Sequence, residues 1–278
     1  KHVILAGDDD QAIYGWAGAD VQRFQDEPAK NIILPQSYRV PQAVQQIADQ
    51  ILNRIPDNRR IKKQWASRPE GGSVDHITSI EDVPLHEGDW LILARTNDKL
   101  IKLKSILQEM AIYFEIKGRK SYKTRLYTAV KHYTRWTNGD KLSLSECKDL
   151  FEFLELEQEL KEERMYDLKE FNYSIEDQWY EVFKSDPEEC LYIREMLRNK
   201  EELSKPARVK LSTIHAAKGG EATNVLLILD NTKKIREAVD KSEDKHDEEH
   251  RVWYVGVTRT KQNLYIMTPK REDRSYDI

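Results

Sequence analysis

The chain is poor in cysteine and has no long apolar run. Its 278 residues include two cysteines, Cys147 and Cys190, which form neither a CxxC metal pattern nor a disulfide framework. This usage favours a reducing compartment, and the cytoplasm is the default expectation. No apolar run approaches the roughly 20 residues that cross a bilayer, and no secretory signal is recognisable. We therefore expect no membrane partner.

An excess of charge of one sign is also missing. Lys and Arg number 45 against 49 Asp and Glu, which gives a net charge of -4. Because no global basic field is present, any nucleic-acid surface must be local. The length is a little under twice a typical domain of about 150 residues, which indicates one large or two ordinary domains. The chain opens on Lys1 and enters an apolar run at once, so we expect it to be part of a longer polypeptide.

Short runs rich in Val, Ile and Leu alternate with amphipathic helical patterns, which is typical of a parallel sheet covered by helices. Helices are predicted to begin at Pro41 and to span residues 99–110. The predicted strands span residues 2–6, 31–34, 73–77, 90–94, 113–116, 209–214, 225–229 and 264–267. The sequence therefore predicts an α/β fold.

The strand signal disappears between about residues 120 and 205, where helical signals replace it. Ser143 and Glu146 form a capping box, and Asp186 followed by Pro187 is typical of a helix start. We predict an all-helical insertion that splits the α/β domain. The highly charged stretch 233–249 is interpreted as a mobile loop or a solvated helix.

The string GDDDQAIYGWAGA occupies residues 7–19, directly after the first predicted strand. Loops at the carboxyl ends of strands face the ligand edge of an open α/β sheet, so its polar side chains can face a phosphate or its magnesium. On composition alone, an acidic turn without function is the commoner interpretation. A two-metal polymerase site is a rival interpretation, but it needs a second acidic cluster, which we do not find in the sequence.

Three further strings have the residue types of a phosphate-handling protein: LPQSYR at 34–39, VKLSTIHAAKGGE at 209–221 and EEHRVWYVGVTRTK at 248–261. A weaker fourth, GDWLILARTN, spans 88–97. Taken singly, Arg39 could pair with a surface acid, and Arg259 could sit at a helix C-terminus. His215 could be structural and Trp16 a core residue. Planar guanidinium groups, however, suit phosphate oxygens, and exposed aromatic rings suit bases.

Taken together, the four strings at residues 7–19, 34–39, 209–221 and 248–261 resemble motifs III, IV, V and VI of the UvrD/Rep-type superfamily 1 DNA helicases, in the family's order. The resemblance implies a RecA-like, P-loop-NTPase-type second motor domain with a parallel sheet, split by a short all-helical insertion. By this resemblance, residues 1–28 are a remnant of the first RecA-like domain, 29–119 and 206–278 form the second, and 120–205 form the insertion.

The resemblance implies a role for each matching residue. Gln11, Arg39 and Arg259 would face the γ-phosphate of ATP as catalytic residues, with Arg259 as an arginine finger. Tyr38 would stack on adenine, and Glu221 would touch the nucleotide sugar. The residues implied in DNA contact are Tyr14, Trp16, Arg95, Asn97, Thr213 and His215. No residue is implied as a metal ligand.

The sequence departs from the family at three of the motif positions. Gly15 and Ala17 stand where relatives commonly carry arginines, so DNA contacts from those two positions are in question. Gly220 replaces the usual leucine, which removes no polar group.

No Gly-x-x-x-x-Gly-Lys-[Ser/Thr] string occurs in the chain. We therefore expect the intact protein, with ATP and Mg²⁺, to couple hydrolysis to 3′-to-5′ translocation on single-stranded DNA and duplex junctions, as in DNA repair or replication. The chain alone would be inactive and would bind neither cofactor tightly. Its implied partner is the first RecA-like domain of the same polypeptide. The alternatives are a naturally truncated, non-catalytic DNA-binding or interaction module and a helicase–nuclease fusion.

Overall fold

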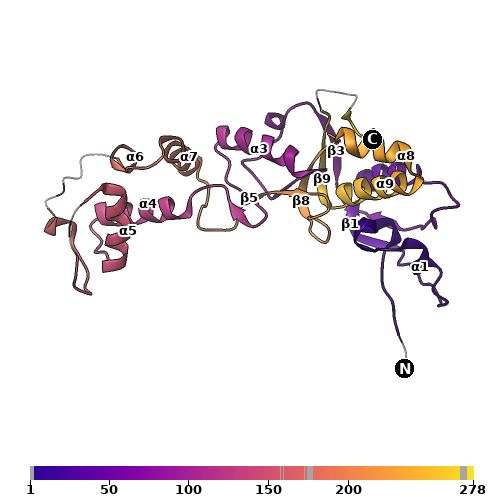
Figure 1. The fold of residues 1–278 in the computed structure, drawn as a ribbon, viewed down its shortest axis with the longest axis horizontal. Helices are drawn as coiled ribbons and strands as arrows, with labels where there is room; N and C mark the ends of the chain where they lie inside the picture. Colours follow the sequence, from indigo (N-terminus) through magenta and orange to yellow (C-terminus); the bar gives the residue numbers. More distant parts are fainter. Residues whose placement is uncertain (1–2, 157, 159, 172, 174–177, 270–273) are drawn as a thin grey trace. The chain divides into compact units, whose positions relative to one another are not determined.

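The computed structural model describes residues 3–156, 158, 160–171, 173, 178–269 and 274–278 (Figure 1). The chain divides into two compact units. Unit 1 comprises Lys1–Lys104 and Arg208–Ile278, and unit 2 comprises Ser105–Ala207. The helix α3 (Asn97–Glu109) contains the boundary between them. Within the described residues, no helix is both long enough and apolar enough to cross a membrane.

The sheet of unit 1 has the strand order β3-β9-β8-β4-β7, and each neighbouring pair runs parallel. This arrangement confirms the predicted fold class. The strands are β3 (Ser73–Ile77), β4 (Trp90–Ala94), β7 (Val209–Thr213), β8 (Ala222–Ile228) and β9 (Thr260–Met267). Two of them match the predicted bounds 73–77 and 90–94, and the other three overlap their predictions with shifted ends.

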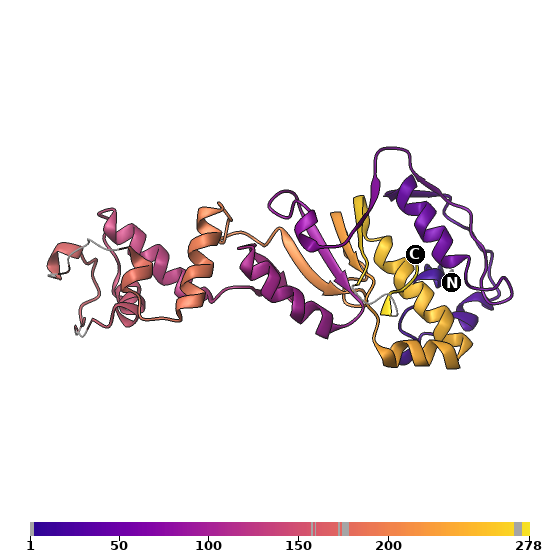
Figure 2. The same cartoon turned by 90° about the horizontal axis from the view of Figure 1, so that it is seen from above.

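Two helices, α2 (Gln42–Leu52) and α9 (Glu243–Val257), lie side by side on one face of this sheet (Figure 2). Successive residues of a strand point to opposite faces, so Leu91 and Leu93 of β4 enter the core beneath these helices. On α9, Gly256 allows close packing, because a Cβ there would lie 3.1 Å from Leu227. Burial of this apolar face positions the two ends of α9, where the candidate site lies.

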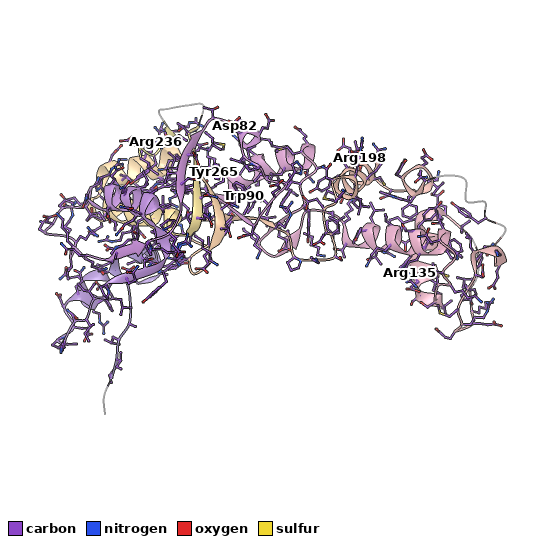
Figure 3. All side chains as sticks on the ribbon, turned by 180° about the vertical axis from the view of Figure 1, so that it is seen from behind. Asp82, Trp90, Arg135, Arg198, Arg236 and Tyr265 are labelled. Carbon is purple, nitrogen blue, oxygen red and sulfur yellow. The ribbon has the colours of Figure 1, made fainter. Side chains whose placement is uncertain are left out.

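The other face of the sheet carries the alternate residues of the same strands. Trp90 begins β4, and its ring centroid lies 5.2 Å from that of Tyr265 on β9 (Figure 3). The Trp90 indole donates to the carbonyl of Glu87 at 2.7 Å, which satisfies its one polar atom. All five residues of β4 are buried, as expected for an apolar strand of a parallel sheet that is covered on both faces.

Unit 1 also contains a small parallel pair of strands, β1 (Gln36–Pro41) and β2 (Ala66–Arg68). The predicted strand at 31–34 is wrong, because pairing with β2 starts only at Gln36 and residues 32–34 are exposed. The predicted helix at Pro41 is correct to one residue, with Pro41 as the N-cap of α2. The backbone at residue 72 lies so close to Pro41 that only glycine fits there, since a Cβ would lie 2.3 Å from Pro41.

The first residues of unit 1 form no strand. The prediction of a strand at 2–6 is wrong for residues 3–6, which are exposed and pair with no strand of the described chain; residue 2 lies outside the described residues. A strand exists only through pairing with a neighbour. The segment continues through two 3-10 turns, η1 (Asp9–Gln11) and η2 (Gly15–Ala17), and the short helix α1 (Val21–Gln25).

The charged stretch 233–249 is not a loop. It forms α8 (Lys233–Lys241), which has no fully buried residue, and the first half of α9. The solvated-helix interpretation therefore holds for α8 but is wrong for α9, where Asp247 and Glu249 are buried. Their charges are compensated by ion pairs with Arg59 and Arg95, which composition alone does not reveal.

Unit 2 is predominantly helical. Its elements are the hairpin β5 (Phe114–Ile116) with β6 (Arg119–Lys120), the helices α4 (Thr124–Thr137), α5 (Leu144–Leu154), α6 (Trp179–Val182) and α7 (Pro187–Arg198), and the 3-10 turn η4 (Leu168–Glu170). The predicted capping box of Ser143 and Glu146 is confirmed, and Asp186 caps α7 as predicted. The Nη1 of Arg135, which lies on α4 and is labelled in Figure 3, is 2.6 Å from Glu146 Oε1. The core of unit 2 is rich in aromatic residues and separate from that of unit 1.

Candidate functional site

Arg259 follows Thr258, the C-cap of α9, and is almost fully buried, with 1% of its surface exposed. Its Nε donates to the carbonyl of Val255 at 2.9 Å. This hydrogen bond satisfies a carbonyl of the last turn of α9, as expected for an arginine at a helix C-terminus. Its Nη2 donates to Gln11 Oε1 at 3.2 Å. Burial, and then the charge of Arg39, lower the pKa of Arg259 to about 10.

Arg39 approaches the same place from β1. Its Nη1 lies 3.6 Å from Glu221 Oε2, and Lys261 Nζ lies 2.7 Å from Glu221 Oε1. The hydrogen bond from Lys261 is the main cause of the lowered pKa of Glu221. Arg39 Nε is buried and has no hydrogen-bond partner in the described structure. We call Gln11, Arg39, Glu221, Arg259 and Lys261 the arginine cluster.

The arginine cluster has the chemistry of an anion site. Three cationic side chains face a single carboxylate, and two of them, Arg39 and Arg259, repel each other. Polyanion oxygens would meet the unpaired Nε of Arg39 and reduce this repulsion. Tyr38, adjacent to Arg39, is 87% exposed, so its ring is free to stack on a planar group. Four of the five residues implied for ATP lie in the arginine cluster, and Tyr38 adjoins it.

The carboxylates of the acidic turn are paired with basic side chains of the same unit, whereas the sequence suggested that they could face a phosphate or its magnesium. Lys63 Nζ pairs with Asp8 at 2.9 Å and Asp10 at 3.3 Å, and it also contacts Asp9. Arg60 Nε lies 2.7 Å from Asp10 Oδ1, and this pair is buried. The polymerase interpretation therefore loses its free carboxylates. The basic run RRIKK at residues 59–63 was the sequence signal for this pairing.

The described residues also contain no group of three or more His, Cys, Asp and Glu arranged to hold a metal ion. Among these residues, Mg²⁺ would therefore find no ready set of carboxylate ligands.

The motif at residues 7–19 is joined directly to the motif at 209–221. The Tyr14 hydroxyl donates to the carbonyl of His215 at 2.7 Å, and Lys218 Nζ donates to the carbonyl of Gln11 at 2.8 Å. The same Lys218 Nζ lies 5.1 Å from the Tyr14 ring centroid. Because Gln11 also contacts Arg259, one short segment connects the arginine cluster with the aromatic residues described next.

A cavity of about 430 Å³ opens beside Trp16, whose residue surface is 72% exposed. We call it the Trp16 cavity. It brings together five of the six residues implied in DNA contact: Trp16, Arg95, Asn97, Thr213 and His215. Tyr14 adjoins it, with ring centroids 6.0 Å from those of both Trp16 and His215. Residues from three distant parts of the sequence thus share one surface.

The charges around the Trp16 cavity are balanced. Arg95 makes a forked contact with the buried Glu249 at 2.9–3.1 Å, and Lys245 Nζ lies 2.6 Å from Glu248. Burial, and then the charge of Arg95, lower the pKa of His215, so its neutral form is favoured at neutral pH. Arg95 lines the cavity as the resemblance implies, but its guanidinium is already occupied.

Sequence analysis missed one wall of the Trp16 cavity. Ile235, Ala238 and Val239 of α8 line it. Their i, i+3, i+4 spacing within a charged run was the available signal, since that spacing places side chains on one helix face. It was outweighed by the composition of residues 233–249.

The parallel sheet, with motif residues gathered at one edge, defines a RecA-like helicase domain. A model of the UvrD-like helicase C-terminal domain matches residues 94–271, and the chain belongs to this family. The chain is similar to the ATP-dependent DNA helicase PcrA of Staphylococcus epidermidis, with 26% identity over 168 residues that cover 52% of this chain and 23% of the relative. PcrA of Staphylococcus aureus gives the same identity and coverage. The match thus spans less than a quarter of the length of these relatives.

Proposed function

We propose that the polypeptide to which this chain belongs is an ATP-dependent helicase or translocase that moves 3′ to 5′ on single-stranded DNA. Its relatives are named ATP-dependent DNA helicases. In this proposal the chain supplies phosphate-sensing arginines and DNA-contact residues, and a first RecA-like domain supplies the other half of the ATP site. Duplex junctions are the expected substrates.

The buried Arg259 beside Arg39 is the observation on which the proposal chiefly rests. Burial of a guanidinium is unfavourable unless its charge is matched. A buried and a half-buried guanidinium group beside one carboxylate suit a site where negative charge arrives and increases, as it does on a transferring phosphoryl group. Arg259 would act as an arginine finger, Arg39 would hold the γ-phosphate, and Tyr38 would stack on the base of the nucleotide.

Gln11 would report nucleotide state to the DNA side. Its side chain accepts from Arg259, and its main chain accepts from Lys218, which also lies over Tyr14. A movement of Arg259 towards a phosphate would break the contact with Gln11 and alter the support of Tyr14 and Trp16. Such coupling needs an element with two arrangements that both sites bias.

The test is ATP hydrolysis by the full polypeptide, with and without single-stranded DNA, for the unmodified protein and for Arg259→Ala. We expect a rate loss of about 10³-fold or more, as for other arginine fingers, with unchanged DNA affinity. Arg259→Lys is the matched control, since it keeps the charge but loses the planar fork, and it should recover little activity.

Near-normal turnover by Arg259→Ala would remove the arginine finger from the proposal. DNA binding by the full polypeptide without any ATP turnover would instead favour a non-catalytic DNA-binding module.

A further inference from the structure

Two histidines of α9 lie one helical turn apart and face each other. His246 and His250 are separated by four residues, a spacing that places side chains on the same face of a helix. Their Nε2 atoms are 3.1 Å apart, and their ring centroids are 4.3 Å apart. Neither residue belongs to the arginine cluster or lines the Trp16 cavity. We call His246 and His250 the histidine pair.

The separation of the two Nε2 atoms suits chelation of a single metal ion. A zinc ion binds an imidazole nitrogen at about 2.0–2.1 Å. Two such bonds that meet at an angle of about 90–110° place the two nitrogens about 2.8–3.4 Å apart. The observed distance of 3.1 Å lies within this range. Rotation of the two rings, without movement of the helix backbone, is therefore sufficient to direct both nitrogens at one ion.

The outer nitrogen of each ring already has an oxygen partner. His246 Nδ1 lies 3.2 Å from Asp247 Oδ1, and His250 Nδ1 lies 2.5 Å from the Tyr276 hydroxyl oxygen. Histidines that bind metals almost always donate the proton of their other ring nitrogen to a carboxylate, a carbonyl or water, which fixes the ring and leaves the ligating nitrogen unprotonated. Both rings of the histidine pair have an oxygen atom in the position that this arrangement requires.

The states with and without an ion differ in the position of one proton. In one consistent arrangement without an ion, His250 Nε2 donates to His246 Nε2, and the Tyr276 hydroxyl donates to His250 Nδ1. With an ion, the proton of His250 lies on Nδ1, which donates to the Tyr276 oxygen, and both Nε2 atoms are free to bind. Both rings are neutral in each state, as metal ligation requires.

The surroundings of the histidine pair favour an ion that prefers nitrogen ligands. The His246 side chain is 39% exposed, so an ion can enter from solvent and keep water ligands. Among the described residues, no third His, Cys, Asp or Glu is arranged to join the pair. Asp247 is paired with Arg59 at 2.7 Å, so its charge adds little attraction for a cation. Imidazole suits Zn²⁺, Cu²⁺ and Ni²⁺, whereas Mg²⁺ and Ca²⁺ prefer oxygen ligands.

We propose that the histidine pair is a binding site for one Zn²⁺ ion, and that the ion strengthens the attachment of the C-terminal segment 274–278 to α9. The C-terminus lies beside α9 in both views (Figures 1 and 2). The Tyr276 ring stacks on Trp253 at 4.8 Å, and its amide donates to the carbonyl of Leu229 at 2.8 Å. An ion that fixes His250 therefore also fixes Tyr276. This inference goes beyond the proposed function and does not depend on it.

The experiment titrates Zn²⁺ into the metal-free full polypeptide in a calorimeter, without nucleotide or Mg²⁺. His246→Ala removes one ligand and should weaken binding of this ion by about 100-fold or more, because loss of an outer hydrogen-bond partner alone costs about 10–100-fold. Tyr276→Phe keeps the stacked ring and loses that outer partner, so it should weaken binding by about 10-fold. His86→Ala, which removes an exposed histidine elsewhere in unit 1, is the matched control and should bind as the unmodified protein does.

Two further measurements identify the ligands and the effect of the ion. Cu²⁺ binds nitrogen ligands more tightly than Zn²⁺ does, and its electron paramagnetic resonance spectrum should show coupling to two imidazole nitrogens that is lost in His246→Ala. Hydrogen exchange of the amides of residues 274–278 should slow by about 10-fold or more at saturating Zn²⁺ in the unmodified protein. The exchange should not change with Zn²⁺ in His246→Ala.

Equal affinity of the unmodified protein and His246→Ala for Zn²⁺ would overturn the inference, because the ion would then bind elsewhere. Failure of the unmodified protein to bind Zn²⁺ would overturn it as well. Binding that depends on His246 without slower exchange in residues 274–278 would remove the role of the ion in attaching the C-terminal segment. ATP hydrolysis and DNA binding are measured separately, so none of these outcomes decides the proposed function.

Discussion

The arginine cluster and the Trp16 cavity both lie in unit 1, but they differ in the balance of positive and negative side chains. In the cluster, Arg39 and Lys261 both pair with Glu221, and the pKa of the nearby Arg259 is lowered to about 10. Around the cavity, Arg95 and Lys245 are each paired with a glutamate. In the proposed function, the arginine cluster would therefore meet the charged phosphates of a nucleotide, whereas the Trp16 cavity offers no unpaired cation among its lining residues.

The turn Asp8–Asp10 belongs to neither surface. Its carboxylates form ion pairs with Arg60 and Lys63 and so attach residues 7–19 to the rest of unit 1. This attachment positions Gln11 in the arginine cluster and Trp16 at the cavity. A cluster of acids that resembles a metal site in the sequence is thus a structural attachment. What separates the two interpretations is the identity of the partners, which the local sequence does not contain.

If the two surfaces have separate roles, the largest expected effect is a loss of ATP hydrolysis without a loss of DNA binding. Arg39→Ala in the full polypeptide should lower ATP turnover by about 10³-fold, because it removes a fixed phosphate donor. Affinity for single-stranded DNA should stay unchanged, since Arg39 does not line the Trp16 cavity. Steady-state hydrolysis and anisotropy titrations on the same preparation would measure both. A comparable fall in ATP turnover and in DNA affinity would show that the two surfaces do not have separate roles.

The next largest expected effect is on stability, when the ion pair between Asp10 and Arg60 is removed. Asp10→Ala leaves Arg60 buried without its main partner and should cost about 3 kcal/mol of unfolding free energy. Replacement of both members, Asp10→Leu with Arg60→Met, should recover most of that loss because no buried charge remains. Urea unfolding would measure both. A loss below about 0.5 kcal/mol for Asp10→Ala would show that the segment is not anchored here.

Acid should weaken both surfaces together, because α9 supports both. Burial, and then His246, lower the pKa of His250 from 6.5 to about 4. Between these values the unfolded chain binds more protons, so stability falls as the pH falls from about 6.5 to about 4, by about 3 kcal/mol. His250 Nδ1 contacts the Tyr276 hydroxyl at 2.5 Å, and Tyr276 stacks on Trp253.

Denaturant unfolding at several pH values in that window would measure this effect, with His250→Gln as the matched variant. The variant should show a flatter pH dependence than the unmodified protein. Parallel curves for the two proteins would assign the acid sensitivity to other groups.

The smallest expected effect concerns the balanced charge of the Trp16 cavity. Trp16→Ala should weaken binding of single-stranded DNA about 10-fold, in the range of one base–aromatic contact. The slope of log affinity against log salt should stay unchanged, because no cation is lost. Titrations at three or more salt concentrations would measure the slope. A shallower slope for the variant would mean that the cavity binds phosphate.

Much of the fold was predictable because apolar runs and caps are local signals. The strands at 73–77 and 90–94 were found with correct bounds, and Ser143 and Asp186 were recognised as caps. The predictions at 2–6 and 31–34 failed because both runs are apolar yet lack a pairing partner over those residues in the described structure. Hydrophobicity indicates what can be buried, and pairing decides what becomes a strand.

The site residues were identified through motif strings, and their arrangement needed the structure. Arg39, Glu221 and Arg259 are far apart in the sequence but lie in one cluster. The pairing of Arg95 with Glu249 was not foreseen, because ion pairs between distant residues leave no periodic pattern. For the same reason, the partners of the acidic turn were missed.

By itself, the sequence determined the fold class and the family resemblance, and it predicted which residues contact phosphate and bases. These depend on local strings and on the periodicity of apolar residues. The tertiary structure alone decided that the acidic turn is neutralised, that α9 is buried despite its charges, and that α8 lines the Trp16 cavity. Charge compensation and cavity formation depend on residues that folding brings together from distant positions, so no window of the sequence contains them.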